Sequence, residues 1–148
     1  MIIPAAVAGT TGFRDFRISK QSRAANSLTG YGYNGDEKTL ETVTVVTLAV
    51  SDILQHVSPP DVMKIDVEGA ELELLQSASS LLEAHRPVIC IETGEQSRQA
   101  VGEIFRVQRY ALFDAEKGLV KGARIELPAW NSIAIPEEKL AGYLSELA

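Results

Sequence analysis

Three carboxylates follow two apolar segments of the chain at the points where those segments end. Asp66 closes the apolar segment 62–66, Glu68 comes two residues later, and Glu92 closes the apolar segment 88–92. In open α/β sheets, ligands bind outside the carboxyl ends of the strands. A carboxylate at such a position can bind a polar ligand or take a proton from it. We therefore predict that Asp66, Glu68 and Glu92 face a common crevice and are the catalytic residues.

A structural role is the alternative for each of these acids. Glu68 and Glu71 lie at the start of a predicted helix, where acidic side chains interact favourably with the helix dipole. A carboxylate at the end of a buried strand, such as Asp66, must be solvated by a crevice or hydrogen-bonded inside it. Glu71 and Glu73 are expected on a solvated helix face. Lys64 either pairs with an acid at the end of its strand or lies on an open side of the sheet.

Few other side chains could bind a ligand or a metal ion. Trp130, Tyr31 and Tyr33 could line a ligand pocket, although packing is the commoner fate of an isolated aromatic side chain. The two histidines, His56 and His85, lie far apart in the sequence and are accompanied by one cysteine. This set contains too few soft ligands for a structural zinc site. We therefore expect no metal site.

The composition is that of an ordinary globular protein. The 148 residues are 45% hydrophobic and 23% charged, which predicts one domain with an apolar core. The net charge of −6 has the wrong sign for a protein that binds nucleic acid. The single cysteine, Cys90, excludes a disulfide within the chain and is expected to be a small buried hydrophobic residue. The N-terminal segment shows no targeting signal or membrane span, so we expect a cytoplasmic protein without membrane contact.

The first third of the chain is typical of strands joined by turns. Residues 2–8 form a short apolar run closed by a glycine-containing turn, which predicts a buried strand. Residues 13–18 alternate between apolar and charged side chains and predict a half-exposed strand. Residues 19–42 lack periodicity and predict a loop. Residues 42–48 are rich in β-branched side chains, and we expect this strand to pair with residues 13–18.

The rest of the chain alternates between helical and strand patterns. Apolar residues recur at helical spacing within 70–84, and the run 88–92 is a continuous apolar strand of the type found in parallel sheets. Such alternation indicates an α/β layer built on a mostly parallel sheet. The predicted elements are a helix at 50–56, a strand at 62–66, a helix at 70–84, a strand at 88–92, a helix at 96–107, strands at 110–113 and 132–135, and a final helix at 137–147.

The segment 63–75 carries a resemblance to a known family. Its sequence, MKIDVEGAELELL, resembles the signature of FkbM-type methyltransferases, which use S-adenosylmethionine to methylate hydroxyl groups of sugars and related natural products. The similarity extends to residues 43–48, 86–92 and 131–136, which resemble sheet strands of that family. Residues 2–18 resemble its third core strand and the turn and strand beyond it.

This resemblance implies a partial Rossmann-like class I methyltransferase fold, with a mostly parallel sheet, flanking helices and an added β-hairpin. It implies S-adenosylmethionine as the cofactor, with Ala6, Val7 and Asp66 on the cofactor side. Glu68 or Glu92 would then orient or deprotonate the acceptor hydroxyl of a small molecule or saccharide. A positioned general base is typically worth about 10²–10⁴ in rate.

One part of the family pattern is missing from this sequence. In the family, a strand, a glycine-rich loop, a helix and a second strand precede the third strand. Segments 9–12 and 31–35 are expected to lack both the glycine spacing and the following helix that a dinucleotide-binding loop requires. The chain thus resembles the C-terminal two-thirds of one methyltransferase domain, truncated at its N-terminus. We expect weak cofactor binding by this chain alone.

The missing strands would leave unpaired sheet edges, which favour pairing with another strand. The possible partners are segment 2–8 against segment 62–66, a second copy of the chain in a homo-oligomer, or a separate N-terminal chain.

Two other functions remain open. The chain could be a non-catalytic remnant or assembly partner that keeps the fold, which the missing cofactor segment favours. It could also be a magnesium-dependent phosphoester enzyme that uses Asp66, Glu68 and Glu92 as oxygen ligands. The absence of an Asp-x-Asp pair on the next strand argues against this last alternative.

Overall fold

The computed structural model describes residues 2–20, 22, 25–31, 39–119 and 123–145. The chain divides into two compact units. Unit 1 comprises Met1–Val57 and Val67–Ala78, and unit 2 comprises Ser58–Asp66 and Ser79–Ala148. None of the helices in the described ranges is long and apolar enough to cross a lipid bilayer. The assignment of residues 1–148 to a single truncated domain stays a prediction.

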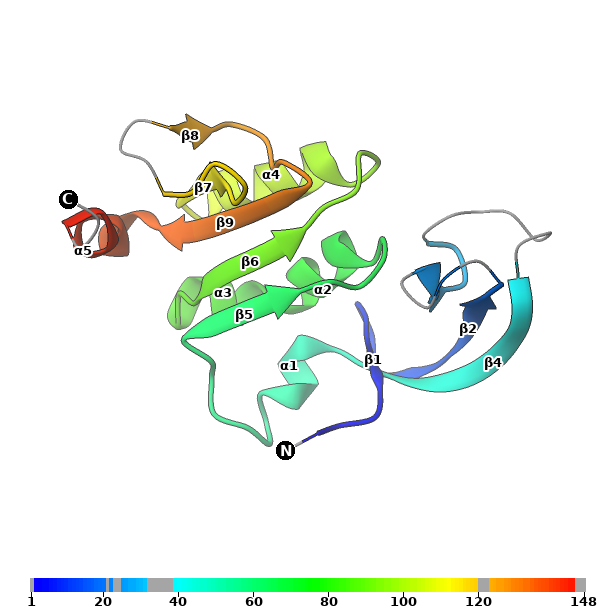
Figure 1. The fold of residues 1–148 in the computed structure, drawn as a ribbon. Helices are drawn as coiled ribbons and strands as arrows, with labels where there is room; N and C mark the ends of the chain where they lie inside the picture. Colours follow the sequence, from blue (N-terminus) through cyan, green and yellow to red (C-terminus); the bar gives the residue numbers. More distant parts are fainter. Residues whose placement is uncertain (1, 21, 23–24, 32–38, 120–122, 146–148) are drawn as a thin grey trace. The chain divides into compact units, whose positions relative to one another are not determined.

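Unit 1 contains a four-stranded sheet (Figure 1). Its strands are β1 (Ala6–Val7), β2 (Gly12–Ser19), β3 (Ser27–Leu28) and β4 (Thr39–Leu48), in the order β1-β4-β2-β3. The predicted pairing of 42–48 with 13–18 is confirmed, since β2 and β4 are antiparallel from Gly12↔Thr47 to Ser19↔Thr39. β3 lies within the segment that was predicted to be a loop.

The strand predicted at 2–8 is only two residues long, and its partner is β4. β1 runs parallel to β4, with Ala6 opposite Thr47 and Val7 opposite Leu48. The Ala8 N–H extends this ladder by donating to the Leu48 carbonyl oxygen at 3.0 Å. In the described residues β1 pairs with β4 and β5 pairs with β6, so pairing of segment 2–8 with segment 62–66, one of the three expected possibilities, stays a prediction.

The helices of unit 1 are α1 (Val50–Ile53) and α2 (Glu71–Ser77). The Ser77 hydroxyl links them: it accepts the Val50 N–H at 3.2 Å and donates to the Leu74 carbonyl at 2.8 Å. The helix predicted at 70–84 is interrupted at Ala78, after which α3 (Ser79–Ala84) begins. No glycine or proline marks this break in the sequence.

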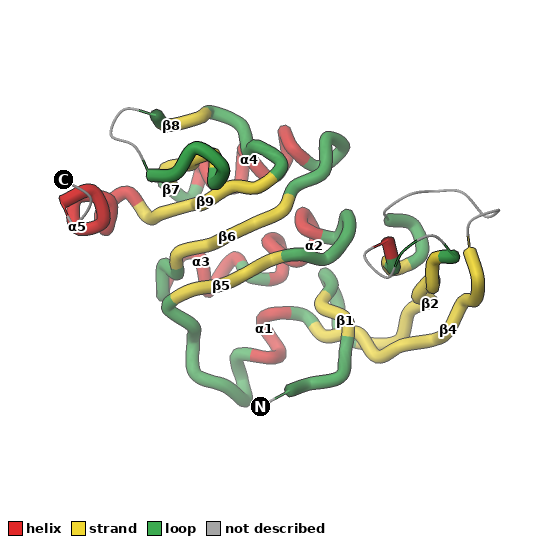
Figure 2. The backbone as a smooth tube through the Cα atoms, viewed as in Figure 1, coloured by secondary structure: helices red, strands yellow, loops and turns green. Residues whose placement is uncertain are grey.

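Unit 2 contains a five-stranded sheet in the order β5-β6-β9-β7-β8 (Figure 2). Its strands are β5 (Val62–Ile65), β6 (Val88–Glu92), β7 (Tyr110–Asp114), β8 (Arg124–Ile125) and β9 (Asn131–Pro136). β5 and β6 are parallel, whereas the other three pairings are antiparallel. A mostly parallel sheet is therefore not confirmed, because both sheets are mixed. β8 lies between the strands predicted at 110–113 and 132–135, where no element was predicted.

One face of this sheet, which we call the α4 face, is covered by α3 and α4 (Arg98–Val107). Strand alternation places Ile89 and Ala134 on it together with Tyr110, whose ring centroid lies 5.6 Å from that of Phe105 in α4. Ile89, Ala134 and Phe105 are fully buried. Burial of such side chains contributes about 25 cal/mol for each Å² removed from water.

The opposite face, which we call the α5 face, is covered only in part. Val88, Phe113 and Ile135 pack there against Leu140, the first residue of α5 (Leu140–Ser145), which follows the 3₁₀ turn η3 (Glu137–Lys139). Toward β5 the cover ends, and Val62 is 59% exposed. Cys90, on the same face, is half-buried, so the prediction of a buried thiol is wrong.

Arg86 ties the helices of unit 2 to each other. It has a left-handed backbone (φ 56°) between α3 and β6, and its guanidinium lies 4.7 Å from the Tyr110 ring centroid. It donates to both carboxylate oxygens of Glu138 at 2.9 and 3.0 Å. It also donates to three backbone carbonyls, those of Leu82, Gln108 and Arg109. One side chain thus closes the ends of α3 and α4 and anchors η3.

We expect Arg86→Ala to lower the free energy of unfolding by about 2–4 kcal/mol, because carbonyl groups and a carboxylate lose their donor. Arg86→Lys should recover part of this loss, since Lys keeps the charge but not the planar fork. Urea denaturation measures both. Arg106→Ala is the matched control, because the exposed Arg106 pairs with Glu103 within α4; it should cost about 0.5 kcal/mol or less. Equal losses for Arg86→Ala and Arg106→Ala would contradict the role of Arg86.

The acid dependence of stability gives an independent check of the same role. The hydrogen bonds from Arg86 lower the pKa of Glu138 from 4.5 to about 2. A carboxyl group whose pKa is lower in the folded state stabilises the fold above its unfolded pKa, and this stabilisation is lost as the pH falls through the folded pKa. The wild-type chain should therefore lose stability between about pH 4.5 and pH 2 more steeply than Arg86→Ala does.

Candidate functional site

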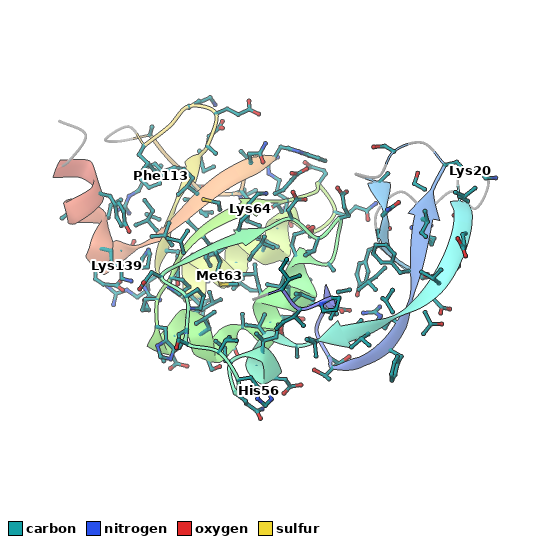
Figure 3. All side chains as sticks on the ribbon, turned by 60° about the horizontal axis from the view of Figure 1, so that its bottom comes forward. Lys20, His56, Met63, Lys64, Phe113 and Lys139 are labelled. Carbon is teal, nitrogen blue, oxygen red and sulfur yellow. The ribbon has the colours of Figure 1, made fainter. Side chains whose placement is uncertain are left out.

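Asp66 and Glu92 lie at the same edge of the unit 2 sheet. Their strands are neighbours, and Ile65↔Ile91 is the last register pair before them. Corresponding positions on adjacent strands project to the same face, which places the two carboxylates side by side at the carboxyl ends of β5 and β6. Asp66 is 49% exposed at its side chain and pairs with Lys64 at 3.5 Å. Lys64, labelled in Figure 3, is itself half-exposed, so both alternatives for this residue hold.

β9 brings two further side chains to this edge. Asn131 is the antiparallel register partner of Glu92 and therefore shares its face. The preceding residue, Trp130, is 61% exposed, and its carbonyl accepts the Thr93 N–H at 2.8 Å. Sequence analysis identified Trp130 as a pocket candidate but missed Asn131. Asn131 is the first residue of its strand, and it reaches this edge because β9 runs antiparallel to β6. The direction of β9 was not predicted.

Thr93 is a polar residue buried next to Glu92. It is 2% exposed, and its Oγ1 has no hydrogen-bond partner in the described ranges. Burying a hydroxyl group without a partner costs free energy, so such an atom marks a place where a ligand or water would be stabilised.

The other predicted site residues belong to unit 1. Ala6 and Val7 are half-buried and make up β1, where their backbone faces β4. Glu68 precedes α2 with a left-handed backbone (φ 49°), and Gly69 follows with φ 104°. Two successive residues with positive φ make a tight entry into α2. Of the three predicted catalytic acids, Asp66 and Glu92 therefore lie together in unit 2, whereas Glu68 belongs to unit 1.

The prediction of a solvated helix face is wrong for Glu71, whereas the side chain of Glu73 is partly exposed, at 36%. Glu71 is 2% exposed, and its Oε1 accepts the Gly69 N–H at 2.7 Å. This bond satisfies an amide at the N-terminus of α2, where four N–H groups lack helical partners. The acid therefore stabilises the turn that follows Glu68.

Glu73 is the centre of a cluster of polar side chains in unit 1. Its Oε2 accepts a hydrogen bond from Arg14 at 3.0 Å, and its Oε1 accepts one from the Tyr31 hydroxyl. The Arg14 guanidinium also lies 5.1 Å from the Tyr31 ring centroid. Tyr31, a pocket candidate in the sequence, thus has a structural contact, whereas Tyr33 lies outside the described residues.

These contacts change the ionisation of the cluster. The hydrogen bond from Tyr31, followed by the Arg14 contacts, holds the pKa of Glu73 below its ordinary value despite partial burial. Burial, followed by the bond to Glu73, raises the pKa of Tyr31. The cluster is therefore a protonated tyrosine, a carboxylate and a guanidinium at neutral pH, which together fasten α2 to β2.

The described residues contain no group of three His, Cys, Asp or Glu side chains that could hold a metal ion. The magnesium-dependent alternative therefore has no ligand cluster in this part of the chain. Gly30, Gly32 and Gly35 do have the spacing of a dinucleotide-binding loop. However, the next described element is the strand β4, and not the helix that such a loop requires.

Comparison with known families gives one match. The family model for the methyltransferase FkbM domain matches residues 2–116, which include Asp66, Glu92 and most of both sheets. No curated protein and no solved structure matches this chain significantly. Trp130 and Asn131 lie outside the matched range.

The Glu73 cluster leaves little space for a side chain at Gly9. A Cβ atom at Gly9 would lie 3.1 Å from the Glu73 Cβ and 3.2 Å from its Oε2, which the bond to Arg14 holds in place. We expect Gly9→Ala to lower the free energy of unfolding by about 1–3 kcal/mol through overpacking. Gly12→Ala is the matched control, because nothing lies within 4 Å of its Cβ position. Urea denaturation of both variants checks this; a Gly9→Ala protein as stable as Gly12→Ala would contradict it.

Proposed function

This chain belongs to the FkbM methyltransferase family, and we propose that it transfers a methyl group from S-adenosylmethionine to a hydroxyl oxygen of a sugar or related natural product. The family match over residues 2–116 is the observation that carries this proposal. The adjacent carboxylates of Asp66 and Glu92 support it, because they supply hydrogen-bond acceptors where α/β sheets bind ligands. In this proposal the chain is part of a Rossmann-like class I methyltransferase domain.

The described residues fit the acceptor better than the cofactor. Asp66 and Glu92 can accept hydrogen bonds from hydroxyl or amino groups, as either ligand requires. In contrast, Ala6 and Val7 have only apolar side chains, and their backbone lies in the ladder with β4. They would hold the cofactor through apolar contact on their exposed sides. When bound, S-adenosylmethionine supplies an electrophilic methyl group on a positively charged sulfur.

We assign the role of general base to Glu92. In the described part of the chain, no Lys or Arg pairs with Glu92, whereas Asp66 pairs with Lys64. A carboxylate without a cationic partner can accept the hydrogen bond of an acceptor hydroxyl without first giving up an ion pair. Glu92 would take the proton of the acceptor hydroxyl, while Asp66 would hold a neighbouring hydroxyl group through a hydrogen bond. Asn131, opposite Glu92, would orient the acceptor, since methyl transfer depends on in-line placement.

Glu68 belongs to unit 1, and its role as a catalytic acid stays a prediction. Its left-handed backbone is fixed by Gly69 and by the Glu71 bond, which gives its carboxylate a defined starting point. The preference for Glu92 rests on its position next to Asp66 within one unit.

A non-catalytic remnant or assembly partner is the second candidate function. The observation that favours it is the lack, in the described chain, of a glycine-rich turn between a strand and a helix. Backbone amides of such a turn supply much of the recognition of a nucleotide cofactor. This second candidate retains the fold but does not bind S-adenosylmethionine.

Cofactor binding separates the two candidates. We expect isothermal titration with S-adenosylhomocysteine, the demethylated product, to show binding in the micromolar range if the chain is an enzyme. The product is the better probe because it cannot react. Arg106→Ala serves as the control for a change remote from both sheet edges. Absence of heat up to millimolar ligand, with a chain that is folded by circular dichroism, would support the remnant and contradict the enzyme.

The roles of the two carboxylates can be tested by isosteric changes. We expect Glu92→Gln to lower kcat by about 10²–10⁴, the range for loss of a general base. Asp66→Asn should act mainly on KM, because the amide still forms a hydrogen bond. Glu95→Gln is the control, since this exposed acid of the same loop pairs only with Arg98. Transfer of a radiolabelled methyl group measures all three; equal activity of Glu92→Gln and Glu95→Gln would exclude Glu92 as the base.

A further inference from the structure

Trp130 is the only tryptophan of the chain, and most of its surface is in contact with water. It is 61% exposed, although burial of an aromatic side chain removes about 150–250 Å² of largely apolar surface from water. It immediately precedes β9, which begins at the edge of the unit 2 sheet where β6 ends (Figure 1). Trp130 therefore lies at the same edge as Asp66 and Glu92.

The backbone next to this exposed side chain is held from two sides. The Trp130 carbonyl accepts the Thr93 N–H at 2.8 Å, and the Pro128 carbonyl accepts the Nε–H of Arg98 in α4 at 2.7 Å. The segment also packs closely on α4, because a Cβ atom at Gly102 would lie 3.1 Å from the Pro128 Cδ. An exposed side chain on a backbone that is already fixed loses less conformational freedom when it binds a ligand.

The ladder between β6 and β9 limits the distance between Trp130 and the candidate base. Asn131 lies opposite Glu92, and opposed residues of an antiparallel pair are about 4.5–5.5 Å apart at their Cα atoms. Because consecutive Cα atoms are about 3.8 Å apart, those of Trp130 and Glu92 are at most about 9 Å apart. Successive side chains of an extended chain point to opposite sides, so a ligand that contacts both residues lies across the end of the sheet.

This end of the sheet combines one flat apolar ring with several polar groups. Asp66 and Glu92 supply carboxylate oxygens, and Asn131 supplies an amide. The buried Thr93 Oγ1, without a partner in the part of the chain that the structure describes, is a further polar atom there. A saccharide has the complementary pattern, since hydroxyl groups surround its rings and C–H groups form their faces. The negatively polarised face of an indole ring, here that of Trp130, attracts such C–H groups.

We propose that Trp130 binds the acceptor by stacking, and that this acceptor is a saccharide with the C–H face of one ring on the indole. The inference rests on the proposed methyl transfer, because it assumes that the acceptor hydroxyl lies at Glu92. Asp66 and Asn131 would bind neighbouring hydroxyl groups, so the stacked ring determines which hydroxyl reaches Glu92. Trp130 lies outside the range 2–116 that the family model matches, and the family assignment therefore does not supply this role.

The fluorescence of Trp130 tests the contact directly, because no other tryptophan contributes to the emission. Acrylamide should quench this emission strongly in the free chain, as the exposure of the residue requires. The probes are the methyl glycosides of glucose, galactose, mannose and rhamnose at millimolar concentrations. We expect at least one of them to lower the quenching constant by about half, because a stacked sugar ring covers one face of the indole. Sorbitol, a polyol without a ring, is the control and should leave it unchanged.

Variants separate stacking from a general effect on the fold. For the glycoside that protects Trp130, we expect Trp130→Ala to weaken binding about 3- to 10-fold, the range for loss of one aromatic contact. Trp130→Phe should retain most of the affinity, since it keeps an aromatic ring. Tyr143→Ala is the matched control, because Tyr143 is an exposed aromatic residue of α5, beyond the other end of β9. Saturation-transfer NMR measures glycoside binding in all three variants without cofactor or turnover.

Three results would overturn the proposal. The first is emission that no glycoside protects, in a chain that is folded by circular dichroism. The second is equal glycoside affinity of Trp130→Ala and the wild type. The third is protection of Trp130 by S-adenosylhomocysteine alone, which would assign the ring to the cofactor. None of them contradicts methyl transfer, which the titration with S-adenosylhomocysteine tests. Conversely, glycoside binding through Trp130 in a chain that does not bind S-adenosylhomocysteine would support the stacking contact and contradict the proposed transfer.

Discussion

β5 and β6 run parallel and in register, so the chain leaves the sheet twice at the same edge. The residues that follow Ile65 and Ile91 can no longer be buried between the two faces, and both are acids. A carboxylate is tolerated at such a point because water or a ligand solvates it. The position of the candidate site therefore follows from strand register, and the antiparallel β9 adds Asn131 to it through the same ladder.

The acidic residues of segment 66–73 have different roles although they are close in sequence. Asp66 is exposed at a strand end, whereas Glu71 is buried and closes the turn at Gly69. Glu73 binds a tyrosine and an arginine from elsewhere in unit 1. A compact acidic motif thus supplies one candidate ligand-binding group and two groups that hold α2 in place. The two structural acids limit the freedom of the Glu68 turn, which is a condition for any precise chemistry there.

Sequence analysis could predict the features that depend on local pattern. Alternation located β2 and β4 and their pairing, and apolar runs located β5 and β6 with their terminal acids. It failed where tertiary contacts decide. The burial of Glu71 depends on a tight turn and the contacts of Glu73 depend on partners that are distant in sequence, whereas helical periodicity alone assigns both acids to solvent. β8 is two residues long, and the break at Ala78 has no glycine or proline to mark it. The mixed strand directions are equally invisible to apolar pattern, because a buried antiparallel strand such as β9 has the same composition as a parallel one.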